Sequence, residues 1–215
     1  MHKKLHNGII ASAISISILG SGTIGAFAAS FDDANDHWAK EAIEIWAGHE
    51  ILQGDDGIFR PDDSITRGEM AVMINRIMNY QDTAENTFSD LPDTWYTDAI
   101  LKLVKQGIMI GSDNEIRPED TVTREEMLVM LARALKIKNS SAKAISFSDS
   151  AAISEWAKDA VQAMTEKGFI NGYEDGSFRP QDNMTRACSV TVVNNSIKGF
   201  YNKPGTYKAD GEING

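Results

Sequence analysis

Cysteine and histidine are scarce in this chain. Its 215 residues include one cysteine, Cys188, and four histidines. A single thiol cannot form a disulfide within the chain, so we expect packed apolar surface, and not a disulfide framework, to stabilise the fold. The sequence disfavours Cys188 as a nucleophile, because the histidines beyond the N-terminal segment, His37 and His49, belong to a different repeat and have no evident partner. A disulfide to another chain is no better supported.

Basic residues are also in short supply. The chain has 21 lysines and arginines against 31 aspartates and glutamates, for a formal net charge of −10. An acidic surface disfavours nucleic acid as a partner, because such binding depends on neutralising phosphates. Beyond residue 28 no apolar run is long enough to cross a bilayer, so we expect no membrane span in the mature chain.

The one long apolar run lies at the N-terminus. The basic start MHKKLHN precedes GIIASAISISILGSGTIGAF, and Ala26-Phe27-Ala28 fits the A-x-A pattern of a signal peptidase site. We therefore expect residues 1–28 to be a signal peptide and the protein to be secreted. A membrane anchor is the alternative, but the run is rich in serine and glycine and no basic residues follow it.

The rest of the chain repeats one unit three times. Each unit begins with a phenylalanine, has a tryptophan seven to nine residues later, and has a glycine 16 residues after the tryptophan. We define module 1 (31–78), module 2 (88–135) and module 3 (147–197) on this basis. Polar linkers (79–87 and 136–146) separate the modules, and the turn-rich tail (198–215) resembles a linker.

Each module has a helical pattern at both ends. In module 1, apolar residues recur at steps of three and four after Trp38 and again after Thr66, which is typical of amphipathic helices. Between them lie a polar turn and an Arg-Pro pair, for which we expect an extended backbone. One such unit cannot bury its own apolar face, so the sequence predicts an all-α fold of three helix-loop-helix repeats packed together.

The second helix of each module begins with a repeated motif, TRGEM, TREEM or TRACS. In the first two copies the threonine and the glutamate three residues later are typical of a capping box. The arginine between them has the wrong charge for a helix start and costs a few tenths of a kcal/mol there. An anionic ligand would reverse that cost, and so would an acid from a neighbouring module. The three arginines are Arg67, Arg124 and Arg186.

These repeated residues resemble the S-layer homology module of bacterial cell-surface proteins. The pattern F-x-D, W-A, G-I-x-x-G, D-G-x-F-x-P and I-T-R-x-E covers nearly the whole chain after residue 30. The resemblance implies a pseudo-threefold assembly of three modules that anchors proteins to the cell wall or S-layer without a cofactor. Its implied partner is a secondary cell wall polysaccharide attached to peptidoglycan, typically bearing ketal-linked pyruvate. The ligand would bind in grooves between modules, with the arginine of T-R-x-E contacting it.

Other repeated residues are candidates for the same site. We expect the three tryptophans to be core anchors first, although sugar faces also stack on tryptophan. The acids of F-x-D would hold the approach to the first helix or accept sugar hydroxyls, the serines beside two of them could join, and the glycines allow positive φ or close backbone approach. These candidates are Trp38, Trp95, Trp156, Asp32, Asp90, Asp149, Ser89, Ser148, Gly54, Gly111 and Gly172.

The third copy departs from the pattern, because Cys188 replaces the capping glutamate. We therefore expect Arg186 to contribute less than Arg67 and Arg124. The acidic loops lack the spacing of a calcium loop, so no metal is expected. The sequence favours a non-enzymatic anchor. A self-assembling structural protein, whose arginines hold modules together, is the main alternative, and a glycan-cleaving enzyme is a weaker one.

Overall fold

The computed structural model describes residues 30–139, 145–197, 201–203 and 206–207. The predicted signal peptide lies outside these residues. The described part is helical, as predicted, with one short hairpin in the tail. Its elements are η1 (Asp32–Ala34), α1 (Lys40–Gly48), α2 (Arg67–Met78), α3 (Thr97–Lys105), α4 (Arg124–Ala134), η2 (Ser150–Ala152), α5 (Lys158–Glu166), α6 (Arg186–Ile197), and the antiparallel strands β1 (Tyr201–Lys203) and β2 (Thr206–Tyr207).

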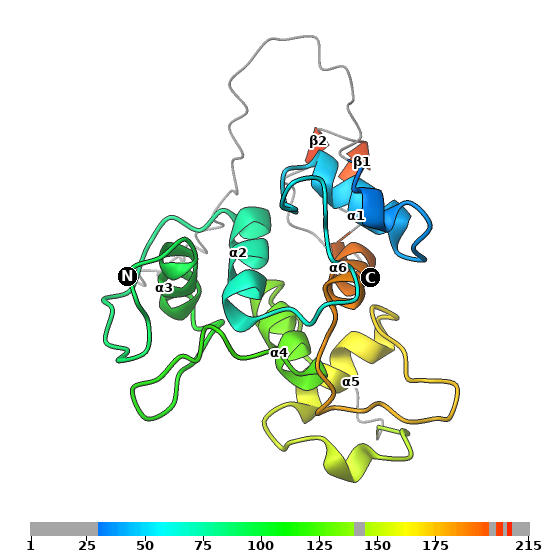
Figure 1. Ribbon diagram of the computed structural model, residues 1–215. Helices are drawn as coiled ribbons and strands as arrows, with labels where there is room; N and C mark the ends of the chain where they lie inside the picture. Colours follow the sequence, from blue (N-terminus) through cyan, green and yellow to red (C-terminus); the bar gives the residue numbers. More distant parts are fainter. Residues whose placement is uncertain (1–29, 140–144, 198–200, 204–205, 208–215) are drawn as a thin grey trace, which may run out of the picture.

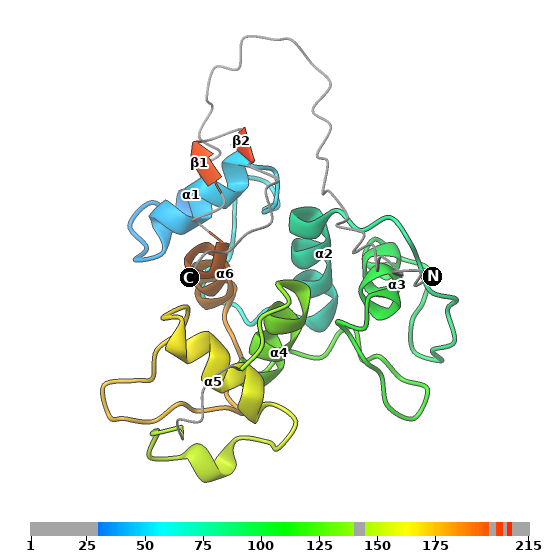
Figure 2. The same cartoon turned by 180° about the vertical axis from the view of Figure 1, so that it is seen from behind.

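The helices pair across module boundaries. Helix α2 of module 1 packs on α3 of module 2, α4 packs on α5 of module 3, and α6 packs on α1 of module 1. Figures 1 and 2 show α2, α4 and α6 in the middle of the molecule and α1, α3 and α5 outside them. Because each outer helix has only nine residues, it is too short to be stable alone and depends on this packing.

Backbone hydrogen bonds join the three modules in a closed cycle. The N–H of Ile65 donates to the carbonyl of Met184 (2.9 Å), that of Met184 to Val122 (2.9 Å), and that of Val122 to Ile65 (3.0 Å). These residues precede the three inner helices and are all buried. The cycle fixes the starts of α2, α4 and α6 next to one another. The pseudo-threefold symmetry of the whole assembly stays a prediction.

A second set of bonds seats each inner helix on the loop of another module. The N–H of Arg67 donates to Asp120, that of Arg124 to Asp182, and that of Arg186 to Asp63, at 2.8–2.9 Å. The first turn of α2 therefore faces the loop of module 2, that of α4 the loop of module 3, and that of α6 the loop of module 1. This order decides which side chains meet at each boundary.

The loop of each module is held by one aspartate. Its two carboxylate oxygens accept hydrogen bonds from two consecutive N–H groups, at 2.6–2.9 Å. The aspartates are Asp33, Asp90 and Asp149. In module 1 the loop-holding residue is thus Asp33, and the sequence assignment of this role to Asp32 was wrong by one position. Counting F-x-D from Phe31 gives Asp33.

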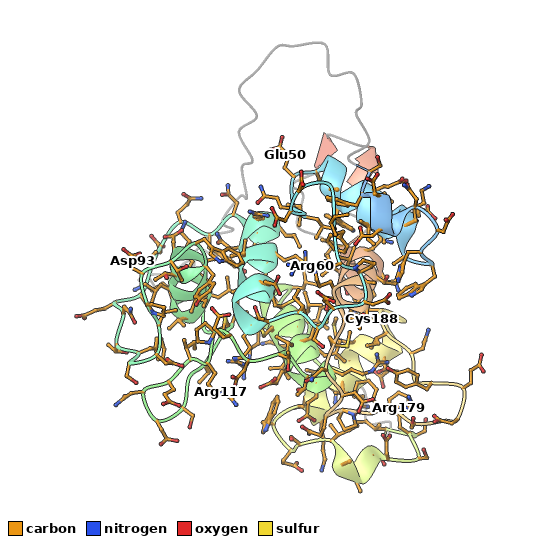
Figure 3. All side chains as sticks on the ribbon, in the orientation of Figure 1. Glu50, Arg60, Asp93, Arg117, Arg179 and Cys188 are labelled. Atoms are coloured by element: carbon orange, nitrogen blue, oxygen red, sulfur yellow. The ribbon has the colours of Figure 1, made fainter. Side chains whose placement is uncertain are left out.

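The Arg-Pro pairs are not extended as predicted. Arg60, Arg117 and Arg179 have φ of +59°, +53° and +57°, in the left-handed region. Each of these residues donates its N–H to the loop-holding aspartate, which stabilises a conformation that costs a non-glycine residue about 1–3 kcal/mol. Figure 3 shows the three arginines in three separate loops around the central helices.

Candidate functional site

The capping boxes form as predicted at α2 and α4. The hydroxyl of Thr66 accepts from the N–H of Glu69 (3.2 Å), and a Glu69 carboxylate oxygen accepts from the N–H of Thr66 (2.9 Å). Thr123 and Glu126 make the same pair of bonds. At α6, Thr185 still accepts from the N–H of Cys188 (3.1 Å), but the cysteine returns no bond. Half of the capping box therefore remains in module 3.

The capping glutamates also neutralise arginines of other modules. Nη1 of Arg67 lies 3.2 Å from Glu126 Oε1, and Nη1 of Arg186 lies 2.5 Å from Glu69 Oε1. Each Nε donates to a backbone carbonyl, that of Ile116 or of Phe59. The sequence left two possible partners for each arginine, an anionic ligand or an acid of a neighbouring module. For Arg67 and Arg186 the structure shows the acid. Their contact with a ligand stays a prediction.

Burial lowers the pKa of Arg67 and of Arg186, and the nearby glutamates oppose that shift. An arginine remains charged at neutral pH in either case, because its ordinary pKa lies far above neutral pH. Both ion pairs are largely shielded from water, with 7–20% of each side chain exposed. Such a pair holds two modules in register, and removing one partner leaves an uncompensated charge.

Arg124 is the exception among the three. The position that corresponds to Glu69 and Glu126 in module 3 is Cys188, and the module order places it opposite Arg124, not Arg186. The expected weakening of Arg186 is therefore not seen in its contacts: Arg186 keeps its carboxylate, and Arg124 is the arginine that lacks one. Within the described residues, the guanidinium of Arg124 makes a single hydrogen bond, from Nη2 to the carbonyl of Asn171 (2.5 Å).

The three repeated tryptophans are not core anchors. Trp38 and Trp95 are 64% exposed and Trp156 is 55% exposed, so the expectation of burial was wrong. A different tryptophan, Trp46, fills that role: it is 1% exposed, and its Nε1 donates to Asn194 across the α1–α6 contact. A large aromatic ring at the surface costs hydrophobic free energy, which favours a role in contacting something else.

Two grooves bring an exposed tryptophan close to a repeated arginine. The Arg186 groove has a volume of about 410 Å³ and includes Arg186, Glu69, Gly54, Arg60 and Trp95 in its lining. It thus joins residues from all three modules.

The Arg67 groove has a volume of about 230 Å³ and includes Arg67, Arg117, Glu126, Ser154 and Trp156. It also takes residues from three modules. Both linings mix charged groups with one exposed ring, a combination suited to a polar ligand with flat apolar faces, such as a sugar.

The glycines serve close packing. A Cβ added to Gly54, Gly111 or Gly172 would lie 2.5–2.6 Å from the ring of the module's first phenylalanine and 2.5–2.8 Å from a backbone oxygen of the loop. The predicted close approach is confirmed, and none of the three has positive φ. Of the serines, Ser89 donates its hydroxyl to the carbonyl of Asn114 (3.2 Å), and Ser148 donates its N–H to Gly176. Ligand contacts of either serine stay predictions.

The loop-holding aspartates have their carboxylate oxygens engaged by backbone groups. Burial raises the pKa of Asp33 and of Asp149, but the hydrogen bonds from the two loop N–H groups outweigh it, and the pKa of each lies below its usual value. Their structural role is therefore clear. Sugar contacts of Asp32, Asp90 and Asp149 stay predictions.

Some residues of the grooves were missed by the sequence analysis. Arg60 and Arg117 line the Arg186 and Arg67 grooves, and the threefold repetition of the Arg-Pro pair was the available signal. Glu125, 1% exposed, accepts from the N–H and hydroxyl of Ser154 and from Nε2 of Gln181, joining modules 2 and 3. The residues at the position of Glu125 in modules 1 and 3 are Gly68 and Ala187, so the repeat pattern did not indicate a role for Glu125.

Neither a metal site nor a membrane span is found in the part of the chain that the structure describes. There, no group of three or more His, Cys, Asp or Glu side chains is placed to hold a metal ion. In the same residues, no helix is long and apolar enough to cross a membrane.

Comparison with known proteins identifies the repeats. The model of the S-layer homology domain matches residues 30–71, 87–128 and 146–187. An amylopullulanase of Thermoanaerobacterium thermosulfurigenes is 36% identical over 76% of this chain and 9% of its own length. The S-layer protein of Bacillus thuringiensis subsp. finitimus is 27% identical over 93% of the chain and 25% of its own length. A cellulosome-anchoring protein of Acetivibrio thermocellus is 29% identical over 66% of the chain and 34% of its length.

These alignments cover a minor part of each relative, between 9% and 34% of its length. Each matched segment begins one residue before a module and ends before that module's last residue, and the three segments together cover more than half of the chain. Relatives with S-layer or anchoring names indicate a cell-surface or S-layer protein. The chain belongs to the S-layer homology domain family.

Proposed function

We propose that this protein is a non-enzymatic anchor that binds an anionic cell wall polysaccharide in grooves between its modules. The observation that carries the proposal is the pairing, in each of the two grooves, of an exposed tryptophan with a repeated arginine. A sugar ring stacks on the tryptophan, polar groups of the polymer bind the charged side of the groove, and the repeated arginines as a set attract its acidic substituent. Membership of the S-layer homology family and the anchoring function named for a relative support a wall polymer as the ligand.

The proposed acidic substituent is a ketal-linked pyruvate. It supplies one carboxylate per substituted sugar of the polymer, and neighbouring sugars would stack on Trp95 or Trp156. A chain of net charge −10 repels an anionic polymer at long range, but salt at physiological strength screens charges beyond about 8 Å. Contacts inside a groove act at shorter distances than this. The affinity should therefore change only modestly with salt.

The test is co-sedimentation with purified cell walls that carry the polysaccharide, compared with walls from which it has been removed. Binding to the first and not to the second is the expected result. Equal binding to both would contradict the proposal. A product assay for released sugar, run on the same samples, should remain negative if the protein is no enzyme.

The second candidate function is structural self-assembly, and one observation favours it. Arg67 and Arg186 each hold a glutamate of another module, which is the role that a purely structural arginine would have. Their removal would therefore destabilise the protein under either function and cannot separate the two. The exposed tryptophans can: an anchor needs Trp95 and Trp156 for wall binding, whereas module packing does not use them.

A further inference from the structure

The three repeated guanidiniums differ in what neutralises them. Arg67 and Arg186 each have a carboxylate at Nη1 and a carbonyl at Nε. Arg124 has neither. Its Nε is fully buried without a hydrogen-bond partner, and it makes no ion pair with any of the described residues. The cause is a single position in the sequence, since Cys188 stands where the other two boundaries supply a glutamate.

The missing counter-charge of Arg124 is energetically unfavourable because the side chain is buried. The residue is 7% exposed, about as buried as Arg67. A buried charge without a counter-charge is strongly unfavourable, and an incoming anion recovers part of that free energy. At the other two boundaries a ligand carboxylate must compete with Glu126 or Glu69 for the same nitrogen. At Arg124 that nitrogen, Nη1, is not used within the described chain.

The surroundings of Arg124 define what can bind there. We call Arg124, Asn171, Tyr173, Phe178 and Cys188 the Arg124 site. The guanidinium carbon lies 4.9 Å from the ring centres of both Tyr173 and Phe178, so two aromatic faces flank it. These rings provide cation–π attraction but no negative charge.

Charges near the Arg124 site are few. Arg179 stacks on Tyr173, with its guanidinium carbon 4.1 Å from the ring centre. The Arg179 side chain is itself paired with Asp175, at 2.7 Å. Asp182, whose carbonyl accepts from the N–H of Arg124, is an exposed acid on the same loop.

A cysteine side chain is shorter than glutamate by more than one carbon–carbon bond, so the place of the missing carboxylate is left for a ligand. Figure 3 shows Cys188 in the central part of the molecule, on α6.

We propose that the Arg124 site is the preferred carboxylate-binding site of this protein, taking one ligand carboxylate per chain in the place that Glu69 and Glu126 occupy at the other boundaries. The inference rests on the proposed function and deepens it, because it names which of three similar boundaries receives the acidic substituent. The exposed tryptophans of the other grooves then contact neighbouring, uncharged parts of the polymer.

The first experiment follows the arginine Nε–H groups by NMR on the full chain labelled with 15N. The probe is a monosaccharide carrying ketal-linked pyruvate, and its methyl ester is the uncharged control. We expect the acid to shift the Arg124 Nε–H signal and to leave the Arg67 and Arg186 signals, whose Nε–H groups are already hydrogen-bonded, nearly unchanged. No shift at Arg124, or an equal shift with the ester, would overturn the inference.

The second experiment uses Cys188→Glu and Cys188→Gln. Glutamate supplies the missing carboxylate and glutamine its uncharged shape, so the pair separates charge from bulk. We expect Cys188→Glu to weaken binding of the pyruvylated monosaccharide at least tenfold and Cys188→Gln to weaken it less than threefold. The same affinity in both variants overturns the inference. Thermal unfolding checks the fold, and Cys188→Glu should unfold at the higher temperature.

The two proposals fail in different ways. In one outcome, the wild-type protein binds polysaccharide-bearing walls, and the Cys188→Glu variant binds the pyruvylated sugar as tightly as the wild type does. That outcome refutes the proposal for the Arg124 site and supports the anchor function. Wild-type protein that binds no wall polysaccharide removes the anchor itself.

Discussion

At the scale of single residues, repetition in this chain separates residues that build the modules from residues that face outward. Gly111 packs against Phe88, and Asp90 holds the loop that follows. Trp95, equally regular in the sequence, lies on the surface. Regular spacing alone therefore does not reveal which role a residue has; burial does.

The exposed tryptophans should matter for binding and not for stability. Trp95→Ala and Trp156→Ala should change the free energy of unfolding by less than about 0.5 kcal/mol, because both rings are exposed. Each change should weaken wall binding about tenfold, equivalent to about 1.4 kcal/mol. Trp46→Ala is the matched control: it removes a buried ring and should cost about 3–5 kcal/mol of stability. Urea unfolding and wall co-sedimentation measure the two effects, and unchanged binding in the first two variants would count against the grooves.

The repeated glycines should tolerate no side chain. In Gly111→Ala the new Cβ would meet the Phe88 ring and the Glu115 carbonyl, each at 2.5 Å, so the variant should lose at least about 1–3 kcal/mol. Gly48→Ala is the control, since nothing lies within 4 Å of its Cβ position and it sits in α1. That change should stabilise the protein by about 0.5–1 kcal/mol. Equal effects of the two changes in thermal unfolding would refute the packing role.

At the scale of elements, a single glutamate at the start of an inner helix both caps that helix and pairs with an arginine of another module. Glu69 closes the capping box of α2 and also neutralises Arg186 at the start of α6. Glu126 does the same for α4 and Arg67. Helix starts from different modules are thus coupled by charge. The arginine that looks misplaced in its own helix is compensated by the helix start of another.

Glu69→Gln tests this coupling. The amide oxygen can still accept the capping bond, so the change mainly removes the charge opposite Arg186. Because the pair is largely buried, we expect a loss of about 1–3 kcal/mol in urea unfolding. Glu174→Gln, an exposed acid without this role, should change stability by less than about 0.5 kcal/mol. Losses of similar size in both would show that the ion pair contributes little.

At the scale of the whole molecule, the three modules form one cyclic assembly whose boundaries differ. Two boundaries carry an arginine–glutamate pair, and the third carries Arg124 opposite Cys188. The acidic loops around this framework depend on ionised aspartates, since Asp33 and Asp149 accept loop hydrogen bonds that a protonated carboxyl would lose in part. Acid should therefore loosen modules 1 and 3 at their loops.

The pH dependence follows from the direction of the pKa shifts. The pKa of Asp33 and of Asp149 is lowered in the folded protein, so their stabilisation is complete above the unfolded value of about 3.9 and is lost as the pH falls through the folded values. The urea midpoint should fall between pH 5 and pH 3. The double variant Asp33→Asn/Asp149→Asn should start lower and fall less over the same range. A fall as steep as that of the wild type would contradict the role of these aspartates.

Local features of the fold could be predicted from the sequence, and features that depend on module order could not. The helices after Trp38 and Thr66 and the capping box at Thr123 follow from short-range spacing, and they are confirmed. The partner of Arg124 depends on which module's helix start faces it, which no local pattern encodes. The exposure of Trp156 likewise depends on a boundary between modules. The loop-holding residue of module 1 could be predicted, because the F-x-D pattern that starts at Phe31 ends at Asp33 and not at Asp32.

The most direct test of the central claim is a calorimetric titration of the protein with purified pyruvylated wall polysaccharide, alongside the same polymer stripped of pyruvate. The account predicts binding to the pyruvylated form, at one carboxylate site per chain, and little or none to the stripped form. Binding of both forms with equal affinity would contradict recognition of the carboxylate. Binding of neither by a folded sample would contradict the anchor and favour the structural alternative.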